Sequence, residues 1–274
     1  MEANKNTSQE IKEAEFKSEN DLIKSKLTEK FGMKDMQSGL DPESENEWLN
    51  YIYEWEKQFA ERKRISVFDR LGKPEFIKHD KLRADEVTIE LDRLLDLMHE
   101  NSLALDSICE YDDRIIYKFL TEELFQEDIN DIRIEGMFTS FIYEEFHPNH
   151  EYDIRELTND FFDNILAENW NDGRAKFQLA DKIQYNGQSF EKNDLVKELH
   201  SFREEVHPAK LELLEFSNLE FDIEKKTGTV EGGISFSVLE NGKPDAHVSA
   251  FFKLNLSYND YYWEICGLNF PEIQ

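Results

Sequence analysis

The first half of the chain has apolar residues at the three- and four-residue spacing of amphipathic helices. Helices are predicted at about 42–64, 85–101, 112–124 and 137–146, where Asp41, Pro42 and Asp112 supply start signals. Their apolar stripes are Trp48, Ile52, Trp55 and Phe59; Val87, Leu91, Leu94, Leu95 and Met98; Ile115, Ile116, Phe119, Leu120 and Leu124; and Met137, Phe138, Phe141, Ile142 and Phe146. Residues 41–147 are therefore predicted to form an acidic, all-helical domain of about four helices.

The first forty residues lack such a stripe. They are rich in Lys, Glu, Ser and Asn, and their apolar residues are too sparse to form a core. We predict a mobile N-terminal arm over residues 1–40, with one short helix over residues 21–33 that ends near Gly32.

The second half begins with helices and continues with strands. Asp153 and Glu156 have the spacing of a capping box at the start of a helix, and a later helix is predicted around Leu195 and Leu199. From Lys210 onward the apolar period changes to two. The alternating runs are Leu219, Phe221 and Ile223; Ile234, Phe236 and Val238; and Val248, Ala250, Phe252, Leu254 and Leu256. Asn241-Gly242 predicts a hairpin turn, and a last strand covers residues 261–270.

Helices followed by a meander of long strands predict the α+β class. The N-terminal all-helical domain is followed by a cone-shaped domain, residues 153–274, with helices packed on a curved antiparallel sheet. The junction is predicted at residues 148–152, because Pro148 disfavours the helical conformation at His147 and Asn149-His150 favours a turn.

The order of these elements has a known counterpart. A long helix, a short helix, an Asn186-Gly187 turn ahead of a third helix, and long strands that end in Tyr-Tyr-Trp263-Glu-Ile265 follow one another over residues 152–272. This arrangement resembles the nuclear transport factor 2-like (NTF2-like) superfamily, also described as the SnoaL-like or cystatin-like cone. The resemblance implies either an enzyme, such as an isomerase or cyclase with an Asp or His inside the cone, or a binding or dimerisation module. Residues 1–150 resemble no family that we recognise.

The net charge of the chain limits the kinds of partner that it is expected to bind. The chain has 60 acidic and 32 basic residues, a net charge of −28, and no basic stripe. Because cations supply most of the affinity for phosphate backbones and anionic membranes, neither nucleic acid nor a membrane is expected as a partner. A well-solvated acidic surface is the simplest interpretation, and a basic protein partner or a nucleic-acid mimic are the alternatives.

The two cysteines, Cys109 and Cys266, each lie beside an isoleucine and are interpreted as small buried hydrophobes. The sequence shows neither a secretory h-region nor a run of 18 apolar residues, so a cytoplasmic protein is expected.

No catalytic residue is predicted, because the inward face of the strands carries no Asp, His or Lys. If the cone has a pocket, its candidate residues are Trp170, Tyr185, Trp263 and Glu264, of which Tyr185 and Glu264 could act as acids or bases. A cavity of several hundred cubic ångströms lined by the three aromatic residues and one buried acid would favour this possibility.

The stretch FIYEEFHPNHEYD, residues 141–153, is the only candidate for a metal site. His147, His150 and Asp153 could act as ligands, but a helix stop and a helix start account for the same residues. The chain has no HExxH motif, no CxxC motif and no glycine-rich phosphate loop, so we predict neither a metal nor a cofactor.

Two hypotheses about function remain open. In the first, the chain is a non-enzymatic interaction or scaffolding protein, and the cone binds a protein partner or forms a homodimer. Phe251, Lys253 and Asn255, on the outer side of a strand, are then the interface candidates. In the second, the cone holds a pocket that binds a small molecule or catalyses an isomerase- or cyclase-like reaction.

Overall fold

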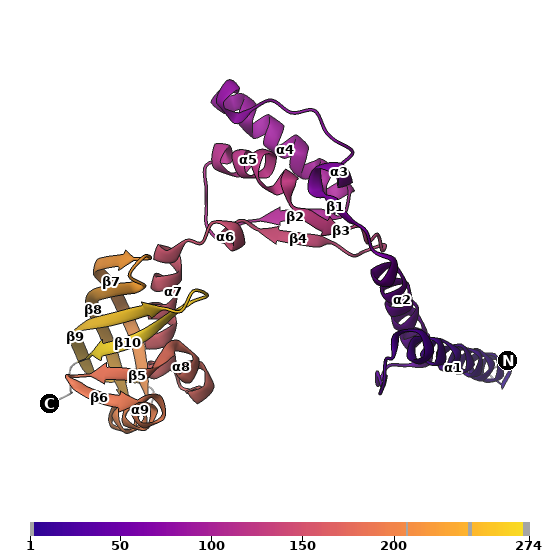
Figure 1. Cartoon of the computed structure of the whole chain (residues 1–274). Coiled ribbons are helices and arrows are strands. Elements are labelled where there is room, and N and C mark those ends of the chain that lie inside the picture. Colours follow the sequence, from indigo (N-terminus) through magenta and orange to yellow (C-terminus); the bar gives the residue numbers. More distant parts are fainter. Residues whose placement is uncertain (1–2, 207, 241–242, 271–274) are drawn as a thin grey trace. The chain divides into compact units, whose positions relative to one another are not determined.

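The computed structural model describes residues 3–206, 208–240 and 243–270. The chain divides into two compact units, Met1–Pro148 and Asn149–Gln274, each with its own hydrophobic core (Figure 1). The turn predicted at Asn241-Gly242 lies outside the described residues.

The first unit begins with two helices that pack against each other, α1 (Ala3–Phe31) and α2 (Pro42–Glu61). Leu27 and Leu49 are fully buried. Asn20 Nδ2 donates hydrogen bonds to the carbonyl of Pro42 (2.9 Å) and to Glu45 (3.1 Å). The sequence predicts only a short helix in this arm, whereas α1 has 29 residues, because the partner helix supplies contacts that its own few apolar residues do not.

The rest of the first unit is a small mixed fold. Its helices are α3 (Val67–Arg70), α4 (Ala84–Glu100), α5 (Asp113–Glu122) and α6 (Tyr143–Phe146), with 3-10 turns η1 (His79–Lys81) and η2 (Leu124–Gln126). Its strands are β1 (Arg64–Ser66), β2 (Leu103–Asp106), β3 (Asp128–Asn130) and β4 (Thr139–Ile142). β1 pairs antiparallel with β3, and β2 pairs parallel with β4.

These strands correct the prediction of an all-helical domain. α2, α4 and α5 lie where the apolar stripes predict helices, but the helix predicted at 137–146 is instead β4 followed by the single turn of α6. The backbone N–H of Thr139 donates to the carbonyl of Ser102 at 3.0 Å, at the start of the pairing with β2. Pairing with a distant strand therefore outweighs the local helical spacing.

In the described part of the second unit, three helices pack with one sheet. The helices are α7 (His150–Leu166), α8 (Asp172–Gln178) and α9 (Lys192–Val206). The strands are β5 (Leu179–Tyr185), β6 (Gln188–Glu191), β7 (Ala209–Asp222), β8 (Thr227–Glu240), β9 (Lys243–Tyr258) and β10 (Trp263–Asn269), arranged in the order β6-β5-β10-β9-β8-β7. All neighbouring pairs are antiparallel except β5 and β10, which run parallel. The α+β class is confirmed, and the element order is the one that the NTF2-like resemblance implies.

The start of α7 differs from the predicted capping box. The N-cap is Asn149, whose side-chain oxygen accepts from the backbone N–H of Tyr152 at 3.1 Å. Asp153 instead lies within the first turn, where its charge favours the helix dipole. The helix thus begins directly after Pro148, inside the stretch predicted as the junction.

The core of the second unit lies between the helices and the inner face of the curved sheet (Figure 1). Phe162 of α7 is buried against Phe252 of β9, with ring centroids 4.7 Å apart. Neighbouring strand positions alternate between this core and the outer face. Among the described residues, the sheet ends on one side at β7, which pairs with β8 alone. Two register shifts interrupt this pairing, at Leu211/Leu213 and Phe216/Asn218.

Candidate functional site

Two of the four predicted pocket residues, Trp170 and Tyr185, pack against the core of the second unit. The Trp170 indole N–H donates to Asp172, and its ring lies 5.3 Å from that of His200. Tyr185, on β5, packs near Phe190 with ring centroids 6.0 Å apart.

The other two pocket candidates lie on β10. Trp263 is buried, with its ring 5.1 Å from Tyr258 and its indole Nε1 3.4 Å from His150 Nδ1. Glu264 is half-buried and faces Ser257 across the β9–β10 pair. Of the four residues, only Trp263 lines the cleft described below.

The three candidate metal ligands also have other partners. His147 Nε2 lies 2.9 Å from Glu123, and the ring stacks on Tyr143. His150 lies among aromatic rings, with Nδ1 3.9 Å from Asp153. Within the described ranges, no group of three His, Cys, Asp or Glu side chains could hold a metal ion.

The three interface candidates lie on the outer face of β9. Phe251 is 59% exposed and is opposite Gly233 of β8, which offers no side chain to cover the ring. Lys253 Nζ lies 2.6 Å from Glu231, and Asn255 is opposite Thr229. We call this surface, centred on Phe251 and Lys253, the outer sheet face.

The polar groups around Phe251 are largely paired with one another. The hydroxyls of Ser235 and Ser249 are 3.0 Å apart, and His247 Nδ1 lies 2.9 Å from Glu212. The outer sheet face therefore combines one exposed aromatic ring with polar neighbours that already have partners.

A second surface feature of this unit is a cleft of about 370 Å³, which we call the α7–α8 cleft. Its walls come from α7, α8 and the turn before β10. The lining residues are Asp153, Glu156, Leu157, Asp160, Arg174, Phe177, Gln178, Tyr261, Tyr262 and Trp263.

The α7 wall of the cleft is acidic. Asp153, Glu156 and Asp160 lie three and four positions apart and so share one face of the helix. Asp160 holds Arg174 in an ion pair at 2.6 Å, and this hydrogen bond and charge raise the pKa of the Arg174 guanidinium above its usual value. Among the described residues, Glu156 has no ion-pair or hydrogen-bond partner.

Aromatic residues form the opposite rim. Phe177 is 63% exposed and stacks on Tyr262, with ring centroids 4.9 Å apart and planes inclined by 25°. Asn259 Oδ1 accepts hydrogen bonds from the backbone N–H groups of Tyr261 (3.1 Å) and Tyr262 (3.0 Å), which fixes the turn that carries them. Tyr261 itself is 88% exposed.

Gln178, in the cleft lining, is only 4% exposed, and its Oε1 has no hydrogen-bond partner. Buried polar atoms without a partner are rare in folded proteins, because each loses its hydration without replacement. The sequence analysis missed this residue, since nothing in the local pattern marks a buried glutamine. The capping-box interpretation of Asp153 and Glu156 accounts for two of the three acidic residues of the α7 wall and does not point to a cleft.

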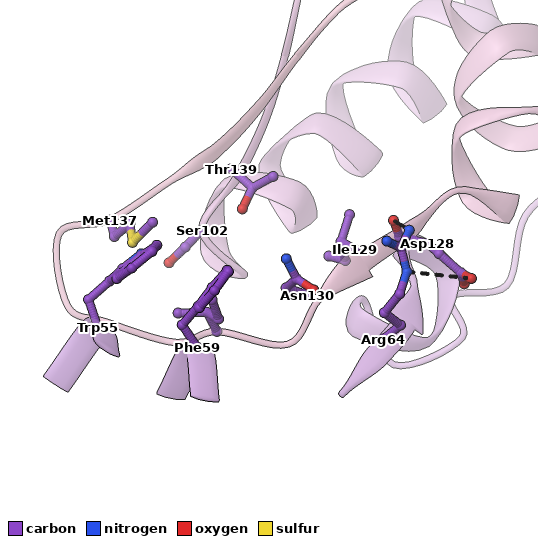
Figure 2. A pocket seen from close by; sticks show the side chains of 10 residues that line it. Trp55, Phe59, Arg64, Ser102, Asp128, Ile129, Asn130, Met137 and Thr139 are labelled. Carbon is purple, nitrogen blue, oxygen red and sulfur yellow. Dashed lines mark hydrogen bonds and ion pairs between the residues drawn. The ribbon is translucent and has the colours of Figure 1, made fainter. Parts of the chain in front are cut away.

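The first unit has a cleft of its own, of about 300 Å³ (Figure 2). Trp55 and Phe59 project into it from α2 and stack with ring centroids 4.7 Å apart. On its other side, Arg64 of β1 lies 3.9 Å from Asp128 of β3, the ion pair that Figure 2 marks with a dashed line. The lining of this cleft therefore combines two stacked aromatic rings with polar residues, two of which already form an ion pair.

Comparison with known proteins supports only a likeness of fold. No family model matches the chain, and no curated protein matches it. Similar solved structures include NTF2-like proteins from Shewanella oneidensis, of unknown function, and from Cytophaga hutchinsonii. The Shewanella protein has 12% identity and a TM-score of 0.34, and the match covers 44% of this chain and 98% of its own. The Cytophaga protein has 13% identity and a TM-score of 0.33, and the match covers 46% of this chain and 99% of its own.

A protein of unknown function with a cystatin-like fold from Nostoc punctiforme is also similar, with 14% identity, a TM-score of 0.34, and coverage of 44% of this chain and 88% of its own. A segment of this chain is thus similar to NTF2-like and cystatin-like proteins, and the order of elements in the second unit remains the basis of the fold assignment. Every helix among the described residues is too short or too polar to span a bilayer.

Proposed function

We propose that the chain is a non-enzymatic protein that contacts other proteins, and that its second unit self-associates through the outer sheet face. The observation that carries this proposal is the exposure of Phe251 on the outer side of β9, opposite a glycine of β8. Burying this ring would remove a large apolar surface from water.

The neighbours of Phe251 favour burial of this face against another protein. Lys253 already pairs with Glu231, and Ser235 with Ser249, so they would keep these partners in an interface. The free-energy cost of removing polar groups from water is small when they keep their hydrogen bonds. A second copy is a suitable partner, because a two-fold axis brings the same patch of each chain together.

Light scattering of the full chain at tens of micromolar tests the proposal. We expect a dimer, and we expect Phe251→Lys to convert it to a monomer, because two lysines would be buried in the interface. Ile89→Lys is the matched control, since Ile89 is 66% exposed on α4 of the first unit. A wild-type monomer, or a dimer that survives Phe251→Lys, would contradict self-association through this face.

A small-molecule site remains the second candidate, and one observation favours it: Trp263, a predicted pocket residue, lines the α7–α8 cleft. In this candidate a free ligand of the size of the cleft occupies it. The binding experiment below, with free amines beside peptides, separates this candidate from a protein partner.

A further inference from the structure

We propose that the α7–α8 cleft binds a basic side chain, arginine or lysine, from a segment of a partner protein. This site uses different residues from the outer sheet face, and the inference goes beyond the proposed self-association without depending on it.

The first argument is the unbalanced charge of the cleft. Three carboxylates line it, and Arg174, the one guanidinium in the lining, is held by Asp160. Glu156 has no partner among the described residues, and it lies on the same helical face as Asp153. A cation that enters the cleft can therefore form a charge-assisted hydrogen bond with Glu156 without displacing an existing pair.

The second argument, independent of the first, is the buried amide oxygen of Gln178. Oε1 can only accept a hydrogen bond, so the group that satisfies it must bring an N–H or O–H donor. Guanidinium and ammonium groups carry both the donors and the positive charge that Glu156 requires. An anionic ligand would meet the carboxylates and leave the amide oxygen unpaired.

The aromatic rim supplies the third argument and indicates the source of the cation. A guanidinium can stack on Phe177 or Tyr262, and the aliphatic stem of a basic side chain can pack along Leu157. Phe177 and Tyr261 extend the apolar surface beyond the cleft and are largely exposed. Residues that flank the basic side chain in a polypeptide would cover them, whereas a free amine would leave them in water.

Binding of peptide pools to the full chain tests the inference. The probes are fluorescently labelled nine-residue peptides with mixed flanks and a central arginine, lysine or citrulline, measured by fluorescence anisotropy. Citrulline keeps the shape of arginine and lacks its charge. We expect the arginine and lysine pools to bind, and the citrulline pool to bind about tenfold to a hundredfold more weakly, as the loss of a charged hydrogen bond predicts.

Two variants test the residues. Glu156→Gln should weaken binding of the arginine pool about tenfold, while Glu198→Gln, which removes an exposed glutamate on α9, should leave it unchanged. Gln178→Leu should also weaken binding, yet raise the melting temperature, because it removes an unpaired buried acceptor from the unliganded protein. Circular dichroism checks that each variant is folded.

The inference is overturned if no pool binds, if citrulline binds as well as arginine, or if Glu198→Gln weakens binding as much as Glu156→Gln. It is also overturned, in favour of a small-molecule site, if arginine amide or spermidine binds as tightly as the peptides. Phe251→Lys should not change the affinity for peptides, so failure of self-association and failure of this site can be told apart.

Discussion

The inner and outer faces of β8 and β9 differ sharply although they are built from the same strands. Phe252 is fully buried against Phe162, while its neighbour Phe251 is 59% exposed. Gly232 faces the core and Gly233 faces outward, one position apart. The inner face therefore determines stability, and the outer face is free to serve contacts with other proteins. Residue type does not distinguish the two; only the alternation of the strand does.

The two adjacent phenylalanines test this difference most strongly. Phe252→Ala should lower the free energy of unfolding by about 3–5 kcal/mol, because it leaves a cavity against Phe162. Phe251→Ala should change it by less than about 0.5 kcal/mol, as for other surface positions. Urea unfolding of the full chain, followed by tryptophan fluorescence, measures both. Equal losses would show that the outer ring is also part of the core.

Substitution of the adjacent glycines Gly232 and Gly233 should show the same difference between the two faces, with a smaller change in stability. A Cβ on Gly232 would lie 2.7 Å from the Phe252 ring and would overlap the carbonyl of Glu215, so Gly232→Ala should destabilise the protein by about 1–3 kcal/mol. A Cβ on Gly233 would approach only the carbonyl of Ala250, at 4.0 Å. Gly233→Ala should therefore leave the melting temperature close to that of the wild type, and a comparable fall for both would contradict the assigned faces.

The ion pair of the outer face should contribute least. Lys253 and Glu231 are 2.6 Å apart but are both partly exposed, so Lys253→Met should lower stability by at most about 1 kcal/mol. Salt screens such pairs, and the difference from wild type should vanish near 1 M NaCl. A difference that persists at high salt would indicate that Lys253 contributes to stability through packing of its side chain on the sheet and not through its charge.

The sequence predicts the elements whose pattern is long enough to be unambiguous. β8 and β9 alternate over 14 and 16 residues, and α4 has an apolar stripe over 17, so their types could be inferred. β4, with four residues, is too short to show a period of two, and its apolar residues also fit a helix. β5 has seven residues, and its parallel partner β10 lies some eighty positions away in the chain, so the local sequence does not reveal this pairing.

The candidate sites were predicted unevenly for the same reason. The exposure of Phe251 follows from local alternation and could be inferred from the sequence, although its role in an interface remains a proposal. The α7–α8 cleft combines a helix, a second helix and a turn before the last strand, so Glu156, Gln178 and Tyr262 become neighbours only through folding. Whether Gln178 Oε1 finds a hydrogen-bond partner depends on the positions of the residues that surround it in the fold, and the periodicity of the sequence does not contain this information.

The free edge of β7 bears on whether contacts between copies form discrete assemblies or fibres. A long edge strand with a regular row of N–H and C=O groups can template the strand of another molecule, and repetition of that step leads to aggregation. The two register shifts in β7 divide its fourteen residues into short regular stretches. They thus discourage growth of an assembly edge to edge, which is consistent with the proposed association through the outer sheet face.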